Sequence, residues 1–389
     1  MLLATIATFA VILAVLVLVH EAGHFFAARI FGIRADEFGF GFPPRLFGAQ
    51  KLKNGKWKFL SARGEGDPEG GTVYSLNWFP LGGFVKIKGE SGENQKDPDS
   101  FAARPIWQRG VVLAAGVTMN VVLAFVLLVA ALMIGMPQDV RDLSDRDLAK
   151  IKNPQVQILE VEKGFPADGI FRPGDVIVSL DGIKIKTIDD VQKYVNAHRE
   201  GIRVGYLRGK IEGESRLVPK VIEGEDRAVF GVNLSEVAFV SYPIHTSIIK
   251  GFNSTFSLIG AILNGYYDLF ARLFSGKGVS AEISGPIGIA VYTGMVVKLG
   301  FIYVLQFAVV LSLNLAILNF IPMPALDGGR FLFLVIEKIR GKAVHVRIEN
   351  FSHTVGFILL MTLVVVITYR DIARWGGDIV RVFKDALGW

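Results

Sequence analysis

Four long uncharged runs dominate the pattern of hydrophobic and polar positions along the chain. They cover residues 1–19, 110–138, 299–326 and 350–369, and each is bounded by charged residues or by histidine. A helix needs about 20 apolar residues to cross a bilayer, so each run predicts a membrane span. A shorter uncharged run at 251–267 carries several Asn, Ser and Thr residues and predicts an amphipathic or interfacial helix instead.

The alternative for the first run is a cleaved signal peptide. The run has no basic start and no small-residue cleavage site, and apolar residues resume after His24. A membrane span is therefore favoured. Lys and Arg number 12 between Arg34 and Arg109 and 5 between Arg330 and Arg347, which places both loops in the cytoplasm.

A small β-rich domain is expected between residues 153 and 236. Strand-like runs cover 156–161, 175–180, 204–207 and 216–221, and a helical pattern covers 188–198. The stretch 164–182 resembles the PDZ domains of bacterial membrane and periplasmic proteases. That resemblance implies a groove that takes a peptide as an added strand.

The predicted fold class is a polytopic α-helical membrane protein with four transmembrane helices, an inserted β-rich PDZ domain and a membrane-associated β-hairpin. The expected segments are a first span at 1–33, a cytoplasmic loop with the hairpin at 34–109, a second span at 110–138, the PDZ domain at 139–236, an amphipathic segment at 237–298, a third span at 299–326, a cytoplasmic loop at 327–349, a fourth span at 350–369 and a tail at 370–389.

Composition agrees with a mixed membrane and water-soluble chain. Hydrophobic residues make up 51% of the 389 residues and charged residues 20%, and there is no cysteine. The missing cysteines exclude disulfides, cysteine nucleophiles and Cys-type zinc sites. The net charge of +6 is spread over several loops, so membrane topology explains it better than nucleic-acid binding does.

An H-E-x-x-H sequence, His20-Glu21-Ala22-Gly23-His24, follows the first run. On a helix, residues four apart lie on one face, so both imidazoles can reach one metal ion. Neutral imidazoles hold Zn²⁺ without neutralising it, and the cation lowers the pKa of a bound water to about 7. Glu21 is placed to deprotonate that water. A structural role is the alternative, but ionisable groups at membrane depth are costly and normally functional.

Asp327, after the third run, is the candidate for a third metal ligand. The first and third spans cross in the same direction, so their C-terminal ends lie on one face, and each ligand follows roughly 20 or more apolar residues. Pro322 and Pro324 break the helix before Asp327, and irregular backbone at this depth is tolerated where it lines a cavity. The alternative is an aspartate that marks the end of a span.

The order of these elements resembles the site-2 protease family of intramembrane zinc metalloproteases, in particular the RseP-like bacterial type with a single PDZ domain. The resemblance rests on the motif at 20–24, on the Asn-x-x-Pro-x-Pro-x-x-Asp-Gly pattern at 319–328 and on the PDZ-like region between them. Gly116-Val-Thr-Met-Asn120 and Ser284-Gly285-Pro286 resemble two further elements of the family.

The resemblance implies roles for individual residues. It makes His20, His24 and Asp327 the ligands of one Zn²⁺ per chain and Glu21 the general base. It also makes Asn319 a donor to the substrate or to the developing oxyanion, a role that suits an amide group. For Asn319, a helix-terminating hydrogen bond near Pro322 is an equal alternative.

The segment 72–88 alternates strand-like residues around Pro80 and a Gly-Gly pair, and predicts an apolar hairpin. In the family, such a membrane-associated β-structure pairs with the substrate as an extra strand. The candidate substrate-binding residues are Asn77, Gly82, Gly83, Phe84, Val85 and Lys86. A cytoplasmic hairpin that rests on the membrane surface is the alternative.

The implied activity is that of a zinc-dependent intramembrane endopeptidase in the lipid bilayer. Its expected substrate is a single-pass transmembrane protein, such as an anti-sigma factor, that an upstream site-1-type protease has already cut; signal-peptide remnants are a second class. The expected location is the bacterial inner membrane, with the active site near the cytoplasmic side and the PDZ domain outside. The rival is a non-catalytic membrane-anchored PDZ scaffold, which would need a broken active site.

Overall fold

The computed structural model describes residues 2–143, 151, 154–209, 211–222, 227–275 and 284–387. The chain divides into two compact units. The first unit comprises residues 1–128, 252–294 and 307–389, and the second comprises 129–251 and 295–306.

Four of the described helices are long and apolar enough to cross a membrane, as the hydrophobic pattern predicts. They are α1 (Leu2–Ile30), α2 (Ile106–Ile134), α7 (Phe301–Phe320) and the part Val346–Arg374 of α9 (Val346–Leu387). α1 continues past both histidines of the H-E-x-x-H motif, so the motif is helical. α9 continues to Leu387, beyond the start of the expected tail at residue 370.

Two helix ends differ from the uncharged runs for local backbone reasons. α2 stops at Ile134 because Gly135 has a φ of +114°, and the last residues of the run form strand β4 (Met136–Asp139). α7 stops at Phe320, just before Pro322, and α8 (Asp327–Arg340) begins after the proline-containing loop. The remaining long helices are α5 (Ile244–Phe274), which covers the expected amphipathic run and is not of spanning type, and α6 (Pro286–Leu299).

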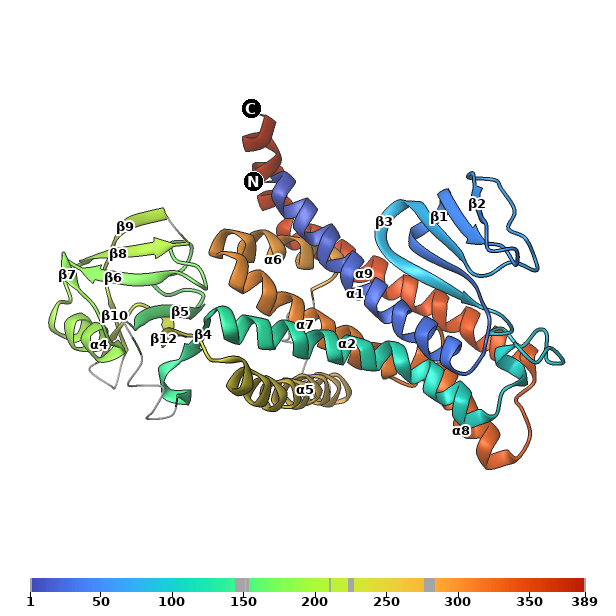
Figure 1. The fold of residues 1–389 in the computed structure, drawn as a ribbon. Helices are drawn as coiled ribbons and strands as arrows, with labels where there is room; N and C mark the ends of the chain where they lie inside the picture. The colour runs from blue at the N-terminus through green and yellow to red at the C-terminus, as the bar shows by residue number, and fades with distance from the viewer. Residues whose placement is uncertain are drawn as a thin grey trace. The chain divides into compact units, whose positions relative to one another are not determined.

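A three-stranded sheet belongs to the first unit, with the order β2-β1-β3. Its strands are β1 (Ala35–Lys51), β2 (Trp57–Leu60) and β3 (Val73–Ile87), and Figure 1 shows β1 and β3 as long curved ribbons. Residues 37–40 of β1 have partners on both sides, at 73–76 and at 83–86 of β3. β3 therefore turns back near Gly82, which has a φ of +107°.

The expected hairpin at 72–88 is consequently split. Its two arms flank residues 37–40 of β1 instead of pairing with each other. Turn residues indicate where a chain reverses, but they carry no information on a strand that enters between the arms from far upstream. The β3 turn lies against α1, because a Cβ at Gly82 would be 3.0 Å from the Val17 side chain.

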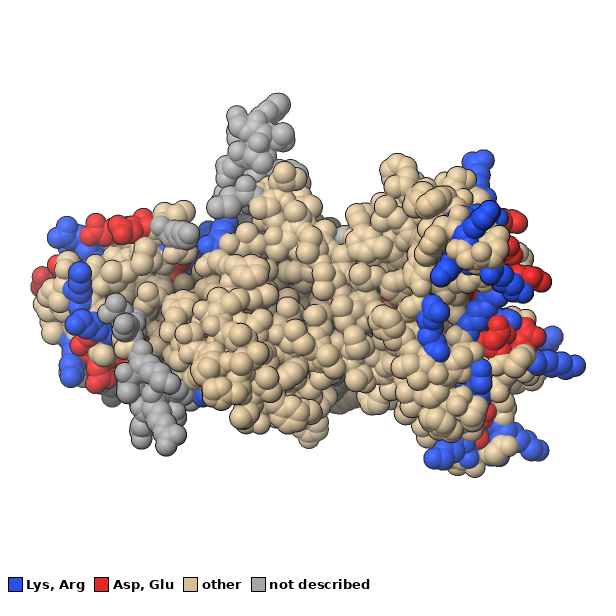
Figure 2. Space-filling view, in the orientation of Figure 1, with Lys and Arg blue, Asp and Glu red and all other residues tan. Residues whose placement is uncertain are grey.

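The core of the first unit lies between α1, α2, α8 and the sheet. Its buried members include Ala28, Ile33, Ile87, Val112, Leu113 and Leu334. The helix faces visible in Figure 2 are largely uncharged, whereas Lys, Arg, Asp and Glu gather over the sheet and the loop after α8. This distribution is that of a membrane-spanning unit with one charged end.

The second unit carries the β-rich insert. Its main sheet has the order β4-β12-β5-β6-β8-β9, with β7 paired to β6, and β10 and β11 form a separate pair. The bounds are β5 (Gln155–Val161), β6 (Val176–Leu180), β7 (Ile183–Lys184), β8 (Ile202–Arg208), β9 (Ile211–Leu217), β10 (Lys220–Ile222), β11 (Arg227–Val229) and β12 (Val232–Val240). Helix α4 (Ile188–Ala197) starts with a capping box made by Thr187 and Asp190.

The insert has its own hydrophobic core, built from the inward residues of its strands and α4. Val156, Ile158, Leu180, Ile202 and Val204 are fully buried there. One expected strand, 216–221, is instead divided between β9 and β10, with Val218 and Pro219 outside both. Proline has no N–H to give to a strand ladder, so the pairing changes partner at this point.

Candidate active site

His20 and His24 lie one turn apart on α1 and meet Asp327, the first residue of α8. His20 Nε2 is 2.9 Å from Asp327 Oδ2, His24 Nε2 is 3.3 Å from the same oxygen, and the two Nε2 atoms are 3.2 Å apart. Both histidines are buried. The structure thus brings together three side chains that are separated by about three hundred residues of sequence, and all three belong to the first unit.

The outer ring nitrogens of both histidines meet polar groups of α2. His24 Nδ1 is 2.8 Å from the Val112 carbonyl oxygen, which can only accept, so Nδ1 is the donor in this contact and Nε2 is the nitrogen left for a metal ion. His20 Nδ1 is 3.2 Å from the side-chain amide of Asn120, which is fully buried. Ser312 of α7 donates a hydrogen bond to the Asn120 carbonyl oxygen, 2.8 Å away, and so ties α7 to this helix.

Gly116 of α2 lets this helix come against both imidazoles. A Cβ at this position would collide with His24 Nε2 and would lie 2.8 Å from His20 Cε1. Gly23, between the two histidines on α1, is just as tightly packed, since its Cβ would be 2.8 Å from Met119 Cγ. α1 and α2 therefore approach each other through glycines at the level of the motif.

Glu21 faces strand β3. Its Oε2 accepts a hydrogen bond from the Val85 backbone N–H at 3.0 Å. Asn319, near the end of α7, has its Nδ2 3.4 Å from His20 Nε2. The general base and the amide donor expected from the sequence thus lie beside the histidines.

The predicted substrate-binding residues are distributed over the sheet and do not all reach the site. Phe84 and Val85 line a cavity together with Glu21, His24 and Asp327. Gly82 and Gly83 form the turn against α1, and Lys86 is exposed. Asn77 is buried inside the sheet, where its Nδ2 donates to the Gly41 carbonyl oxygen at 3.0 Å, so its side chain shapes the strands.

Two cavities open beside the cluster and share Glu21, Leu326 and Asp327 among their lining residues. The larger, of about 460 Å³, extends toward Glu90, Arg330 and His353. The smaller, of about 200 Å³, is bounded by Val17, Leu315 and Asn319. A peptide laid past the cluster would therefore find space on both sides.

The donor set fits a zinc ion. Within the described residues, one group of three metal-binding side chains is found, His20, His24 and Asp327, with their ligand atoms within 4.8 Å of one another. Tetrahedral zinc with ligands at about 2.0–2.1 Å places the ligand atoms about 3.3 Å apart. The observed separations of 2.9–3.3 Å are close to that value. The ligand roles themselves stay a prediction.

Comparison with known proteins decides the family. The model of peptidase family M50 matches residues 8–62 and 66–363. The chain belongs to peptidase family M50. The regulator of sigma-W protease RasP of Bacillus subtilis is 28% identical over 451 residues, which cover 95% of this chain and 98% of that protein. The zinc metalloprotease RasP of Bacillus licheniformis is likewise 28% identical over 454 residues, and the protein FN1322 of Fusobacterium nucleatum is 30% identical over 365 residues, 93% of this chain and 96% of that protein.

Membership in this family makes the chain a zinc metalloprotease of the site-2 protease type, with Zn²⁺ as its cofactor. It is a bacterial membrane protein with four helices that are long and apolar enough to cross the bilayer. Among solved structures, the PDZ domain of an SdrC-like protein from Listeria innocua matches at 23% identity and a TM-score of 0.20, over 21% of this chain and 92% of that chain.

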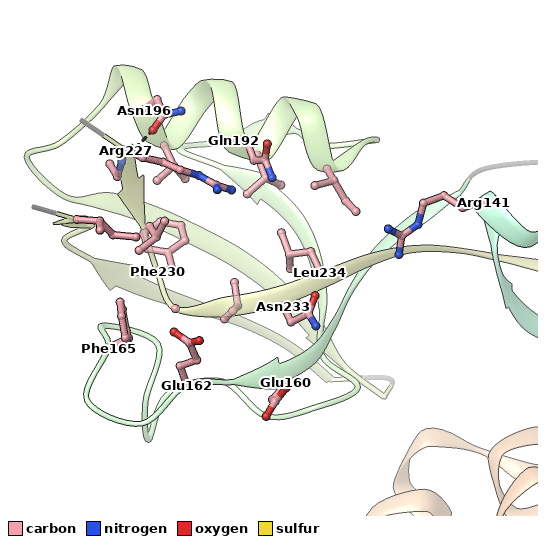
Figure 3. Close-up of a pocket in the computed structure, with 18 residues that line it drawn as sticks. Arg141, Glu160, Glu162, Phe165, Gln192, Asn196, Arg227, Phe230, Asn233 and Leu234 are labelled. Carbon is pink, nitrogen blue, oxygen red and sulfur yellow. Dashed lines mark hydrogen bonds between the residues drawn. The ribbon is translucent and has the colours of Figure 1, made fainter. Parts of the chain in front are cut away.

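The β-rich insert of this M50 protein contains a pocket of about 510 Å³ between α4 and β12. Figure 3 shows Gln192 and Asn196 on the α4 side of it and Leu234 on β12. β5 pairs with one side of β12 at 232–237, whereas β4 covers the opposite side only at 237–240. Near the pocket mouth, the Arg141 guanidinium and the Ser235 hydroxyl hold the pKa of Asp139 well below its usual range.

Several residues of the active site were not selected from the sequence. Gly116 and Asn120 were recognised only as a family-like element, although their spacing of four already places them on one helix face. No sequence pattern predicts that the Val112 carbonyl oxygen contacts His24. His353 has no metal-ligand partner at useful spacing in the sequence, and the structure brings it to the cavity beside Asp327.

Proposed function

We propose that this chain hydrolyses peptide bonds within the transmembrane segments of single-pass membrane proteins, with His20, His24 and Asp327 as the zinc ligands. The observation that carries the proposal is the convergence of the two Nε2 atoms and the Asp327 carboxylate among helices of spanning length. Ionisable groups at membrane depth face a cavity or a partner and normally serve a function.

Hydrolysis at this site requires one water molecule and a shuttled proton. Zinc, when bound, polarises the scissile carbonyl group and makes water more acidic. Glu21 takes a proton from the attacking water, whose oxygen forms a bond to the carbonyl carbon. The Glu21 carboxyl group then gives this proton to the leaving nitrogen as the C–N bond breaks, so that a carboxylic acid and an amine result. Asn319 would donate to the oxygen that becomes negatively charged, and the distance of 3.4 Å between its Nδ2 and His20 Nε2 supports this role.

The edge of β3 is the proposed binding place for the unwound substrate. One side of residues 83–86 is paired with β1, and on the other side the Val85 N–H reaches Glu21. A helical substrate has to unwind before a carbonyl group is accessible, and an extended segment beside β3 would gain main-chain hydrogen bonds. Phe84 and Val85 support this role because they line the cavity that contains Glu21.

The PDZ domain is proposed to bind an extended peptide segment beside β12, at the part of its edge that β4 leaves uncovered. Outside the cytoplasm, it would inspect the shortened substrate and exclude bulky ectodomains. The pocket between α4 and β12 supplies the space that such a strand needs.

An anti-sigma factor is the proposed type of substrate, with signal-peptide remnants as a second type. The name of the Bacillus subtilis relative, regulator of sigma-W protease, supports the first. An upstream site-1-type protease would make the first cut. The basic loops at 34–109 and 327–349 support a location in the inner membrane with the active site near the cytoplasm.

Glu21→Gln tests the proposal. We expect the purified variant to keep the parent's zinc content and to lose cleavage of a model single-span peptide in detergent, because an amide cannot take the proton. Glu69→Gln, which changes an exposed carboxylate of the sheet region, is the matched control and should cleave like the parent. Cleavage by Glu21→Gln at the parental rate would refute the mechanism, and absence of cleavage by the parent would favour the non-catalytic PDZ scaffold.

A further inference from the structure

The loop that delivers Asp327 contains a backbone conformation that alanine rarely adopts. Ala325, two residues before Asp327, has a φ of +80°. For a residue with a side chain this left-handed region is sterically unfavourable, so surrounding contacts must hold it. The Ala325 N–H donates a hydrogen bond to Nδ1 of His353, 2.9 Å away. The strained residue is therefore fixed from α9, the fourth spanning helix.

The direction of this hydrogen bond defines the state of His353. A backbone N–H can donate only to a ring nitrogen without a proton, so the imidazole is neutral and carries its proton on Nε2. The ring also lies against Phe333 of α8, with a centroid distance of 5.9 Å. His353 thus contacts both the loop before Asp327 and the helix that Asp327 starts.

A second residue on the same face of α9 packs against the loop before Asp327. Gly356 is three residues after His353, and residues at this spacing share a helix face. A Cβ at Gly356 would collide with the Pro324 carbonyl oxygen and lie 2.6 Å from Pro324 Cβ. The backbone of α9 is therefore packed directly on Pro324, while His353 holds the next residue, Ala325.

We propose that His353 is a positioning residue of the zinc site: by accepting the Ala325 N–H, it holds the loop between α7 and α8 in the conformation that aims the Asp327 carboxylate at His20 and His24. The inference rests on the proposed function, in which Asp327 is a ligand. His353 itself is not a ligand. Its effect passes through the backbone at Ala325, and α9 thereby becomes part of the support of the metal site.

Two substitutions of similar size separate the acceptor from the bulk of the ring. His353→Asn keeps an acceptor, Oδ1, at the position of Nδ1, whereas His353→Leu keeps apolar volume without an acceptor. We expect His353→Leu to bind zinc about tenfold more weakly in competition with a chromophoric chelator, as is typical when a supporting contact of a ligand is lost. His353→Asn should stay close to the parent. Equal zinc affinity of the leucine variant and the parent would overturn the proposal.

Ala325→Gly tests whether the effect passes through the backbone. Glycine takes positive φ values without steric penalty, so the loop should need less help from His353. In the A325G background, His353→Leu should weaken zinc binding by less than about threefold instead of about tenfold. The same loss in both backgrounds would show that His353 does not act through residue 325 and would also overturn the proposal.

The controls keep this inference separate from the proposed function. Thr354→Ala removes a hydrogen bond within α9, to the Asn350 carbonyl oxygen, without touching the loop, and should leave zinc affinity unchanged. Asp327→Ala should weaken zinc binding more than any His353 variant. If Asp327→Ala has no effect, the ligand assignment fails; if it has its effect and His353→Leu has none, only the positioning role fails.

Discussion

Gly116→Ala should weaken zinc binding although it makes α2 a better helix. A Cβ at this position would lie 2.7 Å from His24 Cε1 and 2.8 Å from His20 Cε1. Carbon atoms in ordinary contact are about 3.5–4.0 Å apart, so the rings or the helix would have to move by about 0.7 Å or more. Neither imidazole can move freely, because Val112 and Asn120 hold their outer nitrogens. The displaced atoms are the ones that we assign to the metal.

The expected magnitude follows from two opposing effects. Overpacking of this kind costs about 1–3 kcal/mol, which corresponds to a loss of about 5–150-fold in zinc affinity when the strain falls on the ligands. Replacing glycine by alanine inside a helix stabilises it by about 1 kcal/mol. We therefore predict a variant that folds, and that differs from the parent mainly in metal binding.

Gly110→Ala is the matched control on the same helix. Its Cβ would lie 3.5 Å from the Phe331 ring, an ordinary contact, so only the gain in helix propensity is expected. Both variants are titrated with zinc against a chromophoric chelator, and their thermal unfolding is followed without zinc. The reasoning is refuted if Gly116→Ala binds zinc as tightly as Gly110→Ala does.

Two further substitutions test other parts of the structure. Asn120→Leu removes the amide beside His20 Nδ1 and should lower zinc affinity about tenfold in the same titration, whereas an unchanged affinity would show that Asn120 does not support the ligand. Asp175→Ala removes the carboxylate that accepts two hydrogen bonds from Arg208, at 2.7 and 2.8 Å, and one from the Arg172 N–H. The β-rich insert should lose about 2 kcal/mol of unfolding free energy, measured by urea denaturation of the full chain; an unchanged denaturation midpoint for this variant would contradict a stabilising role of the Asp175–Arg208 pair.

Helical periodicity predicted the local geometry of the candidate zinc site. Residues 20 and 24 had to share a face of α1, and the direction of the spans was enough to bring Asp327 to the same end. The contacts that support these side chains were harder to predict, because they depend on distances between helices. The sequence around His353 does not predict that its ring accepts a hydrogen bond from the backbone of Ala325 in a distant loop. The positive φ of Ala325 could not be predicted either, because alanine rarely adopts this conformation.

The sheet of the first unit likewise has features that the sequence predicts and features that it does not. The turn near Gly82 could be predicted from its glycines, and the alternation on both sides indicated strands. The insertion of residues 37–40 between the two arms of β3 could not be predicted in this way. Pairing between distant segments depends on tertiary packing, here against α1, and not on local propensity. This insertion leaves the other edge of residues 83–86 toward Glu21, which is why β3 is the proposed substrate-binding strand.

The zinc site is tested most directly by zinc K-edge X-ray absorption of the purified protein and of Asp327→Ala. We predict one zinc per chain in the parent, with two imidazole nitrogens and a carboxylate oxygen among the nearest atoms at about 2.0–2.2 Å. Asp327→Ala should bind less zinc and lose that oxygen from the spectrum. A parental spectrum without two imidazoles, or an identical zinc content and spectrum in Asp327→Ala, would contradict the assignment of His20, His24 and Asp327 as ligands.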